Sequence, residues 1–184
     1  HVHAPSRRLV VLGSTSAYLF GAVHDYPPPW IDENAPIDLK KPRVQGEEFL
    51  RTECGAILLR VAGIYGPGRN PYDWIKDGRV VLSEKFVNLI HVEDLAAICV
   101  AALECGVSGD VYNVSDGVPR TWREIGRALA ADALEPRKGE ERDIPGKRLN
   151  TTKLRTLLKE ARVSIRHPDL FHALEDLQQR RTRL

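Results

Sequence analysis

Two loops of this 184-residue sequence carry side chains suited to chemistry. Residues 13–18 read GSTSAY and offer three aliphatic hydroxyls followed by a phenol. Residues 63–71 read GIYGPGRNP and combine glycine and proline with tyrosine, arginine and asparagine. Hydroxyls hydrogen-bond carbonyl or alcohol oxygens, and a tyrosine can pass a proton when its pKa is lowered. The loops therefore favour oxygen chemistry on a small molecule, whereas the alternative for residues 13–18 is a turn that holds backbone amides.

Both loops follow apolar runs that predict buried strands. Residues 8–12 (RLVVL) and 56–60 (AILLR) are short and rich in branched side chains, and residues 44–53 between them predict a helix. Strand, helix and strand in this order form the crossover unit of a parallel sheet, and ligands of such sheets bind beyond the carboxyl ends of the strands. We therefore expect both loops to open on one side of the sheet and to line one cleft.

The remaining chain continues the alternation of strands and helices. A capping box, Thr121 with Glu124, predicts a helix start. Residues 137–148 are polar and predict a surface loop, and the tail from residue 168 to 184 is amphipathic. Two further strands are predicted over residues 86–92 and 110–114, and two further helices over residues 93–104 and 153–161.

The composition is that of a folded globular protein, with 42% hydrophobic and 28% charged residues. The net charge of +2 gives no electrostatic reason for a nucleic-acid partner, and no apolar run approaches the ~20 residues that span a membrane. Three cysteines without C-x-x-C spacing predict neither a disulfide framework nor a zinc site. We expect a cytoplasmic protein that acts on a small molecule and binds no metal. Whether it forms a homodimer is left open.

Five motifs then occur in a fixed order: STSAY at 14–18, WIDE at 30–33, LRVAGIYGPGR at 59–69, IHVEDLA at 90–96 and VYNVSD at 111–116. This succession resembles the NAD(P)-dependent epimerase/dehydratase family, the extended short-chain dehydrogenase/reductases, and is most similar to their atypical branch. The resemblance implies an α/β fold, with part of a Rossmann-type parallel sheet in residues 1–70. It implies a small substrate-binding subdomain in residues 71–184, intermixed with returning strands and helices.

The resemblance also implies hydride transfer at a carbinol carbon, with NAD or NADP as the cofactor. Thr15 and Tyr18 are expected to be catalytic, because their hydroxyls would polarise the reacting oxygen. The expected cofactor-binding residues are Gly13, Ser14, Arg43, Val61, Ala62, Gly63 and Ile64. The expected substrate-binding residues are Tyr65, Arg69, Asn70 and Trp74.

The sequence departs from the family in its cofactor motif. The family begins with a glycine-rich dinucleotide fingerprint, and neither G-x-G-x-x-G nor G-x-x-G-x-x-G occurs here. The chain therefore resembles the C-terminal portion of such a protein, lacking about two or three units of ~30 residues each. The absence of methionine agrees with that expectation.

A second departure concerns catalysis. Active relatives carry a Tyr-x-x-x-Lys dyad, and this sequence places Leu39 where the tyrosine and Arg43 where the lysine are expected. Arginine can hydrogen-bond a ribose but stays protonated and cannot act as a base. Two hypotheses follow: an oxidoreductase or epimerase-like enzyme, or a dinucleotide-binding sensor or scaffold without turnover.

Other polar candidates favour structural roles. His91 precedes Asp94 and could pair with it, but a histidine at a strand-to-helix junction more often bonds backbone. Asn113 and Asp116 are expected to bond loop backbone. Relatives that bind nucleotide sugars carry an arginine before the His-Val-x-Asp motif, and residues 86–90 (FVNLI) hold none, which weakens such a substrate.

Overall fold

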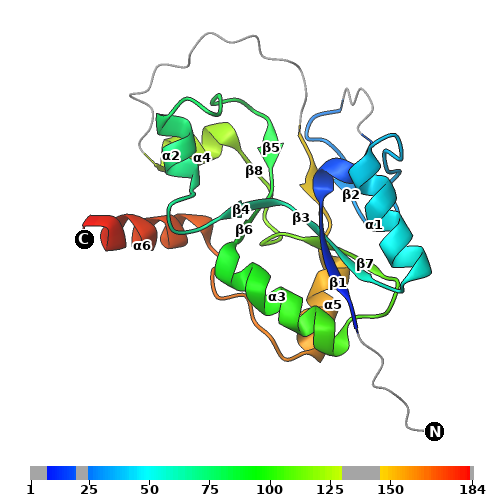
Figure 1. Cartoon of the computed structure of the whole chain (residues 1–184). Coiled ribbons are helices and arrows are strands. Elements are labelled where there is room, and N and C mark those ends of the chain that lie inside the picture. Colours follow the sequence, from blue (N-terminus) through cyan, green and yellow to red (C-terminus); the bar gives the residue numbers. More distant parts are fainter. Residues whose placement is uncertain (1–7, 20–24, 130–145, 183–184) are drawn as a thin grey trace, which may run out of the picture.

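A parallel sheet forms the centre of the computed structural model, which describes residues 8–19, 25–129 and 146–182. Its three strands are β1 (Val10–Ser14), β3 (Ile57–Val61) and β7 (Val111–Val114), in the order β1-β3-β7. Helix α1 (Pro42–Glu53) covers one face, and α3 (Val92–Cys105) with α5 (Thr152–Glu160) covers the other (Figure 1). The predicted α/β class with parallel strands is confirmed.

The register of the sheet brings the two candidate loops to one edge. Ser14 lies opposite Val61, so β1 continues two residues further than the predicted strand. After Ala62 the chain leaves the three-stranded sheet as β4 (Gly63–Tyr65), which pairs in parallel with β6 (Leu89–His91). Both loops thus follow strands that end side by side, as the sequence predicted.

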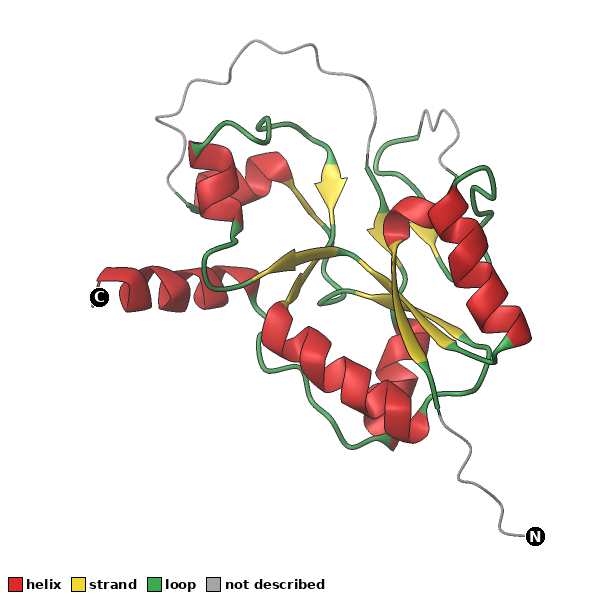
Figure 2. Ribbon diagram, viewed as in Figure 1, coloured by secondary structure: helices red, strands yellow, loops and turns green. Residues whose placement is uncertain are grey.

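A second layer of short elements lies beyond this edge, towards the upper left of Figure 2. Strand β5 (Phe86–Val87) pairs antiparallel with β8 (Arg120–Thr121), next to α2 (Pro71–Lys76) and α4 (Trp122–Ala128). Helix α6 (Leu170–Thr182) packs on them through Leu170 and Leu174. These elements share an apolar core separate from the one beneath the sheet, and the chain beyond residue 70 contributes to both cores.

Asn88 explains why the single strand predicted over residues 86–92 is divided into β5 and β6. Its side-chain amide donates to the Lys147 carbonyl at 2.7 Å, and its side-chain oxygen accepts from the Leu149 N–H at 3.1 Å. These bonds tie β9 (Arg148–Leu149) to the break, and β9 pairs in parallel with β2 (Trp30–Ile31). The loop predicted up to residue 148 therefore ends earlier; its residues 137–145 lie outside the described residues.

The predicted helices appear with bounds shifted by at most two residues, and Thr121 and Glu124 form the predicted capping box. Helix α2 was not predicted. Its signals are local, because Asn70 caps it and Pro71 occupies the first helical position. Among the described helices, none is long and apolar enough to cross a bilayer.

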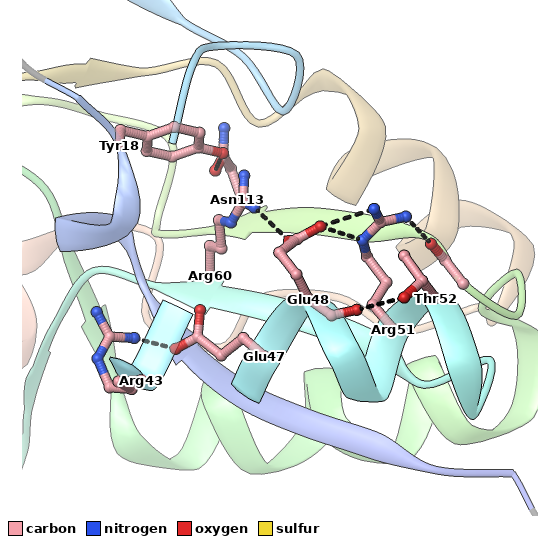
Figure 3. Close-up of polar contacts among 9 residues, drawn as sticks. Tyr18, Arg43, Glu47, Glu48, Arg51, Thr52, Arg60 and Asn113 are labelled. Atoms are coloured by element: carbon pink, nitrogen blue, oxygen red, sulfur yellow. Dashed lines mark hydrogen bonds and ion pairs between the residues drawn. The ribbon is translucent and has the colours of Figure 1, made fainter. Parts of the chain in front are cut away.

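A buried polar network joins the first loop, β3, β7 and α1 (Figure 3). Arg60, on β3, is 2% exposed and pairs with Glu48 of α1 at 3.0 Å. Its guanidinium lies over the Tyr18 ring, 4.8 Å from the centroid, and the Tyr18 hydroxyl donates to Asn113 Oδ1 at 2.6 Å. A buried charge is tolerated only when it is paired and hydrogen-bonded, so this network holds α1 and the first loop against the sheet.

Replacing Tyr18 by phenylalanine should measurably destabilise the fold. The change leaves the buried Asn113 Oδ1 without its donor, and an unsatisfied buried polar group costs about 1–3 kcal/mol. Urea unfolding of the variant checks this value. The matched control is Tyr26→Phe, because Tyr26 is 57% exposed and should change stability little. Equal stabilities of the two variants would contradict a structural role for the Tyr18 hydroxyl.

Candidate functional site

A cavity of about 370 Å³ lies where the two loops meet at the carboxyl edge of the sheet. Thr15 of the first loop and Gly63 of the second face the same space. The described residues that line it are Thr15, Gly63, Trp74, Lys85, Phe86, Val87, Asn88, Leu89, Trp122, Gly146 and Lys147. The cavity therefore combines an aromatic and apolar wall with a hydroxyl, an amide and two amines.

Thr15 is the hydroxyl that this arrangement leaves available. The first loop forms a short turn, η1 (Thr15–Ala17), capped by Ser14, whose Oγ accepts from the Ser16 N–H at 3.2 Å. The alternative of a turn that holds backbone amides thus applies to Ser14. Thr15 is half-buried, and no hydrogen bond joins its hydroxyl to the described residues. Its side chain can consequently bond a ligand oxygen.

Three cationic side chains converge on this turn. Lys41 Nζ donates to the Ser16 carbonyl at 2.9 Å, and Arg43 Nη2 donates to Ser16 Oγ at 3.1 Å. Lys147 Nζ donates to the Thr15 carbonyl at 2.9 Å. Of these three residues, the sequence analysis predicted only Arg43 as a binding residue, for the cofactor. Two of the three cations are also paired with carboxylates, Lys41 with Asp38 and Arg43 with Glu47.

Lys147 reaches the cavity from far along the chain, and no spacing in the sequence indicated it. Burial lowers the pKa of its amine, and the positive charges of Lys41 and Lys85 lower it further. Lys85 also lines the cavity. A lysine with a lowered pKa in a cavity is a recurrent feature of functional sites.

Tyr18, which the sequence predicted to be catalytic, does not line the described cavity. Its side chain is 2% exposed, is absent from the cavity lining and bonds Asn113. Burial raises the pKa of the Tyr18 phenol, whereas the sequence-based hypothesis needed a lowered pKa. The first loop approaches the second as expected, but its phenol turns into the sheet.

Leu39 and Arg43 stand where the family's Tyr-x-x-x-Lys dyad is expected. Leu39 precedes α1 and is 55% exposed. Arg43 lies in the first turn of α1 and forms an ion pair with Glu47, whose carboxyl pKa is raised by burial. A Cβ at Gly13 would lie 2.9 Å from the Glu47 carboxylate, so a larger residue there would require Glu47 to move. The packing against Glu47 thus explains why glycine stands at position 13.

The second loop distributes its predicted residues differently. Tyr65 is fully buried in the second core, and burial raises the pKa of its phenol. Asn70 caps α2 by accepting the Asp73 N–H at 3.0 Å, and Arg69 lies 5.8 Å from the Trp74 ring. Of the four predicted substrate residues, only Trp74 lines the described cavity, where it packs edge-to-face on Trp122 at 6.2 Å.

The four residues predicted to bind the cofactor at positions 61–64 differ in their exposure to solvent. Val61 is 5% exposed within β3, and Ala62 and Ile64 are half-buried. Gly63 is exposed and lines the cavity, and a Cβ there would meet the Leu89 side chain at 2.8 Å. Gly63 therefore allows the close approach of β4 and β6 and brings backbone to the cavity.

A separate cluster brings together His91, Glu93 and His167, whose ligand-type atoms lie within 4.8 Å of one another. His91 caps α3, with Nδ1 accepting the Glu93 N–H at 3.3 Å, so the proton of the neutral ring sits on Nε2. That tautomer offers a metal no lone pair on His91. The Asp94 carboxylate accepts hydrogen bonds from the N–H groups of Arg166 and His167 at 2.7 and 3.0 Å. Both His91 and Asp94 therefore bond backbone, as the structural interpretation of this motif expected for His91.

Comparisons with known proteins agree on the fold. No protein-family profile matches the chain, and the YeeZ protein of Escherichia coli K12 is 35% identical over 57 residues, 31% of this chain and 21% of that protein. A functionally unknown protein from Silicibacter pomeroyi is 26% identical (TM-score 0.68, 94% of this chain, 66% of that one). The Bordetella bronchiseptica enzyme WbmG, solved with NAD, is 21% identical (TM-score 0.67, 95% and 59%).

A dTDP-glucose 4,6-dehydratase of Bacillus anthracis, solved with NAD, is 15% identical, with a TM-score of 0.63 over 94% of this chain and 62% of that one. This chain thus spans about three fifths to two thirds of the length of these solved proteins. Nearly all of this chain therefore has the Rossmann-type fold of the NAD-dependent epimerases and dehydratases, the family that its ordered motifs resemble.

Proposed function

We propose that this chain provides the substrate side of an NAD(P)-dependent oxidoreductase or epimerase-like enzyme that transfers hydride at a carbinol carbon. The observation that carries the proposal is one cavity lined by both Thr15 and Gly63 at the carboxyl ends of paired parallel strands. Ligands of open parallel sheets bind at that position. The Thr15 hydroxyl would hold the reacting oxygen, and Trp74 with Trp122 would form the apolar wall for the substrate.

The residues present fit the nicotinamide end of a dinucleotide. Gly63 exposes backbone at the cavity, and Thr15 supplies a hydroxyl without a partner among the described residues. The pyrophosphate normally needs a glycine-rich turn at a helix N-terminus, and this sequence has no such motif. When bound, the dinucleotide supplies the hydride acceptor or donor. The chain itself orients the alcohol and handles its proton.

The cellular setting proposed here is the cytoplasm, with a small molecule as the partner. Cys54, Cys99 and Cys105 are all free thiols, which agrees with a reducing compartment. The solved structures similar to this chain include a complex of WbmG with NAD and UDP, so a protein of this fold binds a nucleotide in addition to the cofactor.

A second candidate function is a dinucleotide-binding sensor or scaffold without turnover. The exposed Leu39 in the tyrosine position favours it, because an aliphatic side chain cannot move a proton. Arg43 favours it as well, since a guanidinium stays protonated. Repeated turnover of an alcohol or ketone by the protein would exclude this candidate.

The 184-residue chain should bind dinucleotide only weakly. Its residues offer contacts at the nicotinamide end, while helix-terminus contacts to the pyrophosphate supply much of the affinity in this fold. Calorimetric titration with NAD and with NADP should therefore give dissociation constants weaker than micromolar. A micromolar constant for either cofactor would contradict the view that this chain contacts mainly one end of it.

Saturation-transfer NMR with millimolar NAD should then show which end is contacted. We expect the nicotinamide protons to receive more saturation than the adenine protons, and Thr15→Val to reduce the nicotinamide signal several-fold. The matched control is Thr52→Val, because Thr52 is exposed on α1 and its hydroxyl bonds the Glu48 carbonyl and Glu53 of that helix, away from the cavity lining. Stronger adenine signals, or equal signals in the two variants, would count against the proposed site.

A further inference from the structure

Lys147 occupies the cavity in a way that a solvated surface lysine does not. Its side chain is half-buried, its Nζ lies 2.9 Å from the Thr15 carbonyl, and it lines the cavity beside the Thr15 hydroxyl. Buried lysines are rare in proteins because desolvation disfavours the ammonium ion. The amine thus lines the same cavity as the Thr15 hydroxyl and bonds the backbone of the residue that carries it.

The backbone around Lys147 is held on both sides. The Lys147 carbonyl accepts from the Asn88 side chain at 2.7 Å, and the following residue begins β9, which pairs with β2. The preceding residue, Gly146, bridges to Phe86 in the parallel sense, and its backbone has a positive φ of 79° that favours glycine. These contacts fix the backbone that carries the amine beside the first loop, and a catalytic group requires such a rigid support.

Two positive charges among the described residues act on Lys147. They are Lys41, at the start of α1, and Lys85, next to β5, and both lower the pKa of the Lys147 amine after burial itself has done so. Lys41 pairs with Asp38 at 3.4 Å, and no carboxylate is among the described residues that line the cavity. A lowered pKa means that the amine becomes neutral at a lower pH than an ordinary lysine does, and only the neutral amine can accept a proton.

We propose that Lys147 is the acid–base residue of this site and takes over the role of the dyad tyrosine, whose position Leu39 occupies. The inference rests on the proposed function. In the oxidative direction the O–H and C–H bonds of the carbinol break and a C=O bond forms. The proton passes from the hydroxyl to the neutral amine, and the hydride with its electron pair goes to an oxidised nicotinamide dinucleotide. In the reductive direction the ammonium returns the proton to the carbonyl oxygen.

The first experiment measures the Lys147 amine in the 184-residue chain without cofactor. Lysines labelled by reductive ¹³C-methylation are titrated by NMR, and Lys147→Arg identifies the Lys147 signal by its loss. We expect that signal to titrate at lower pH than the others, with Lys159→Arg, an exposed lysine on α5, as the control. Titration of the Lys147 signal together with the exposed lysines would overturn the proposal.

The second experiment measures NAD(P)-dependent oxidation of a panel of secondary alcohols by the wild-type protein and two variants. Lys147→Ala should lower the rate by about 10²–10⁴-fold, and added methylamine should restore part of it, because general acid–base catalysis contributes that factor. Lys147→Arg keeps a donor for the Thr15 carbonyl but cannot accept a proton, so it should be equally inactive. The wild-type rate should rise with pH through the Lys147 pKa, and Lys159→Ala should leave it unchanged.

The outcomes separate the two claims. Full activity of Lys147→Arg, or absence of rescue by methylamine, would overturn the acid–base role and leave the proposed function standing. A low Lys147 pKa without turnover of any alcohol would overturn the proposed oxidoreductase and the acid–base role with it.

Discussion

The parallel pairing of β1 with β3, with Ser14 opposite Val61, is the constraint on which the site depends. Adjacent strands lie about 4.8 Å apart, so equal strand ends bring the following loops together. A register shift of one residue would turn every side chain of β1 to the opposite face. Val10 would then no longer pack against the apolar core, and Thr15 would leave the cavity. The chemistry at the edge is thus tied to the packing of the sheet.

The buried Arg60 decides what the first loop can do. Its charge lies on the α1 face of β3 and must be compensated there, which Glu48 and the Tyr18 ring accomplish (Figure 3). Because Tyr18 also bonds Asn113, its phenol serves the fold and is withdrawn from the cavity. The group that could move a proton must then come from another element. In this structure the element is the segment that leads into β9.

Cations replace the expected dyad around the Ser/Thr turn. Lys41, Arg43 and Lys147 all donate to Thr15 or Ser16, so a field from three cations acts where a reacting oxygen would bind. Asp38 and Glu47, which pair with Lys41 and Arg43, reduce that field. Such a field stabilises an alkoxide, because a negative charge that develops in a desolvated cavity gains from fixed cations. Burial, and then the charges of Lys41 and Lys85, lower the pKa of the Lys147 amine, which links the electrostatics of the turn to the proposed proton transfer.

Local features of the sequence determined the elements, their order and the two loops. Apolar runs, the Thr121 capping box and the glycine and proline positions act over a few residues, and the helices they predict are present within two residues. They also determined that Thr15 and Gly63 would share one edge, because parallel strands align their ends. The tertiary structure alone decided that Tyr18 turns inward, since that depends on a charge buried on another strand. It alone decided that Lys147 reaches Thr15 across 132 residues, because no periodicity encodes a contact at that separation.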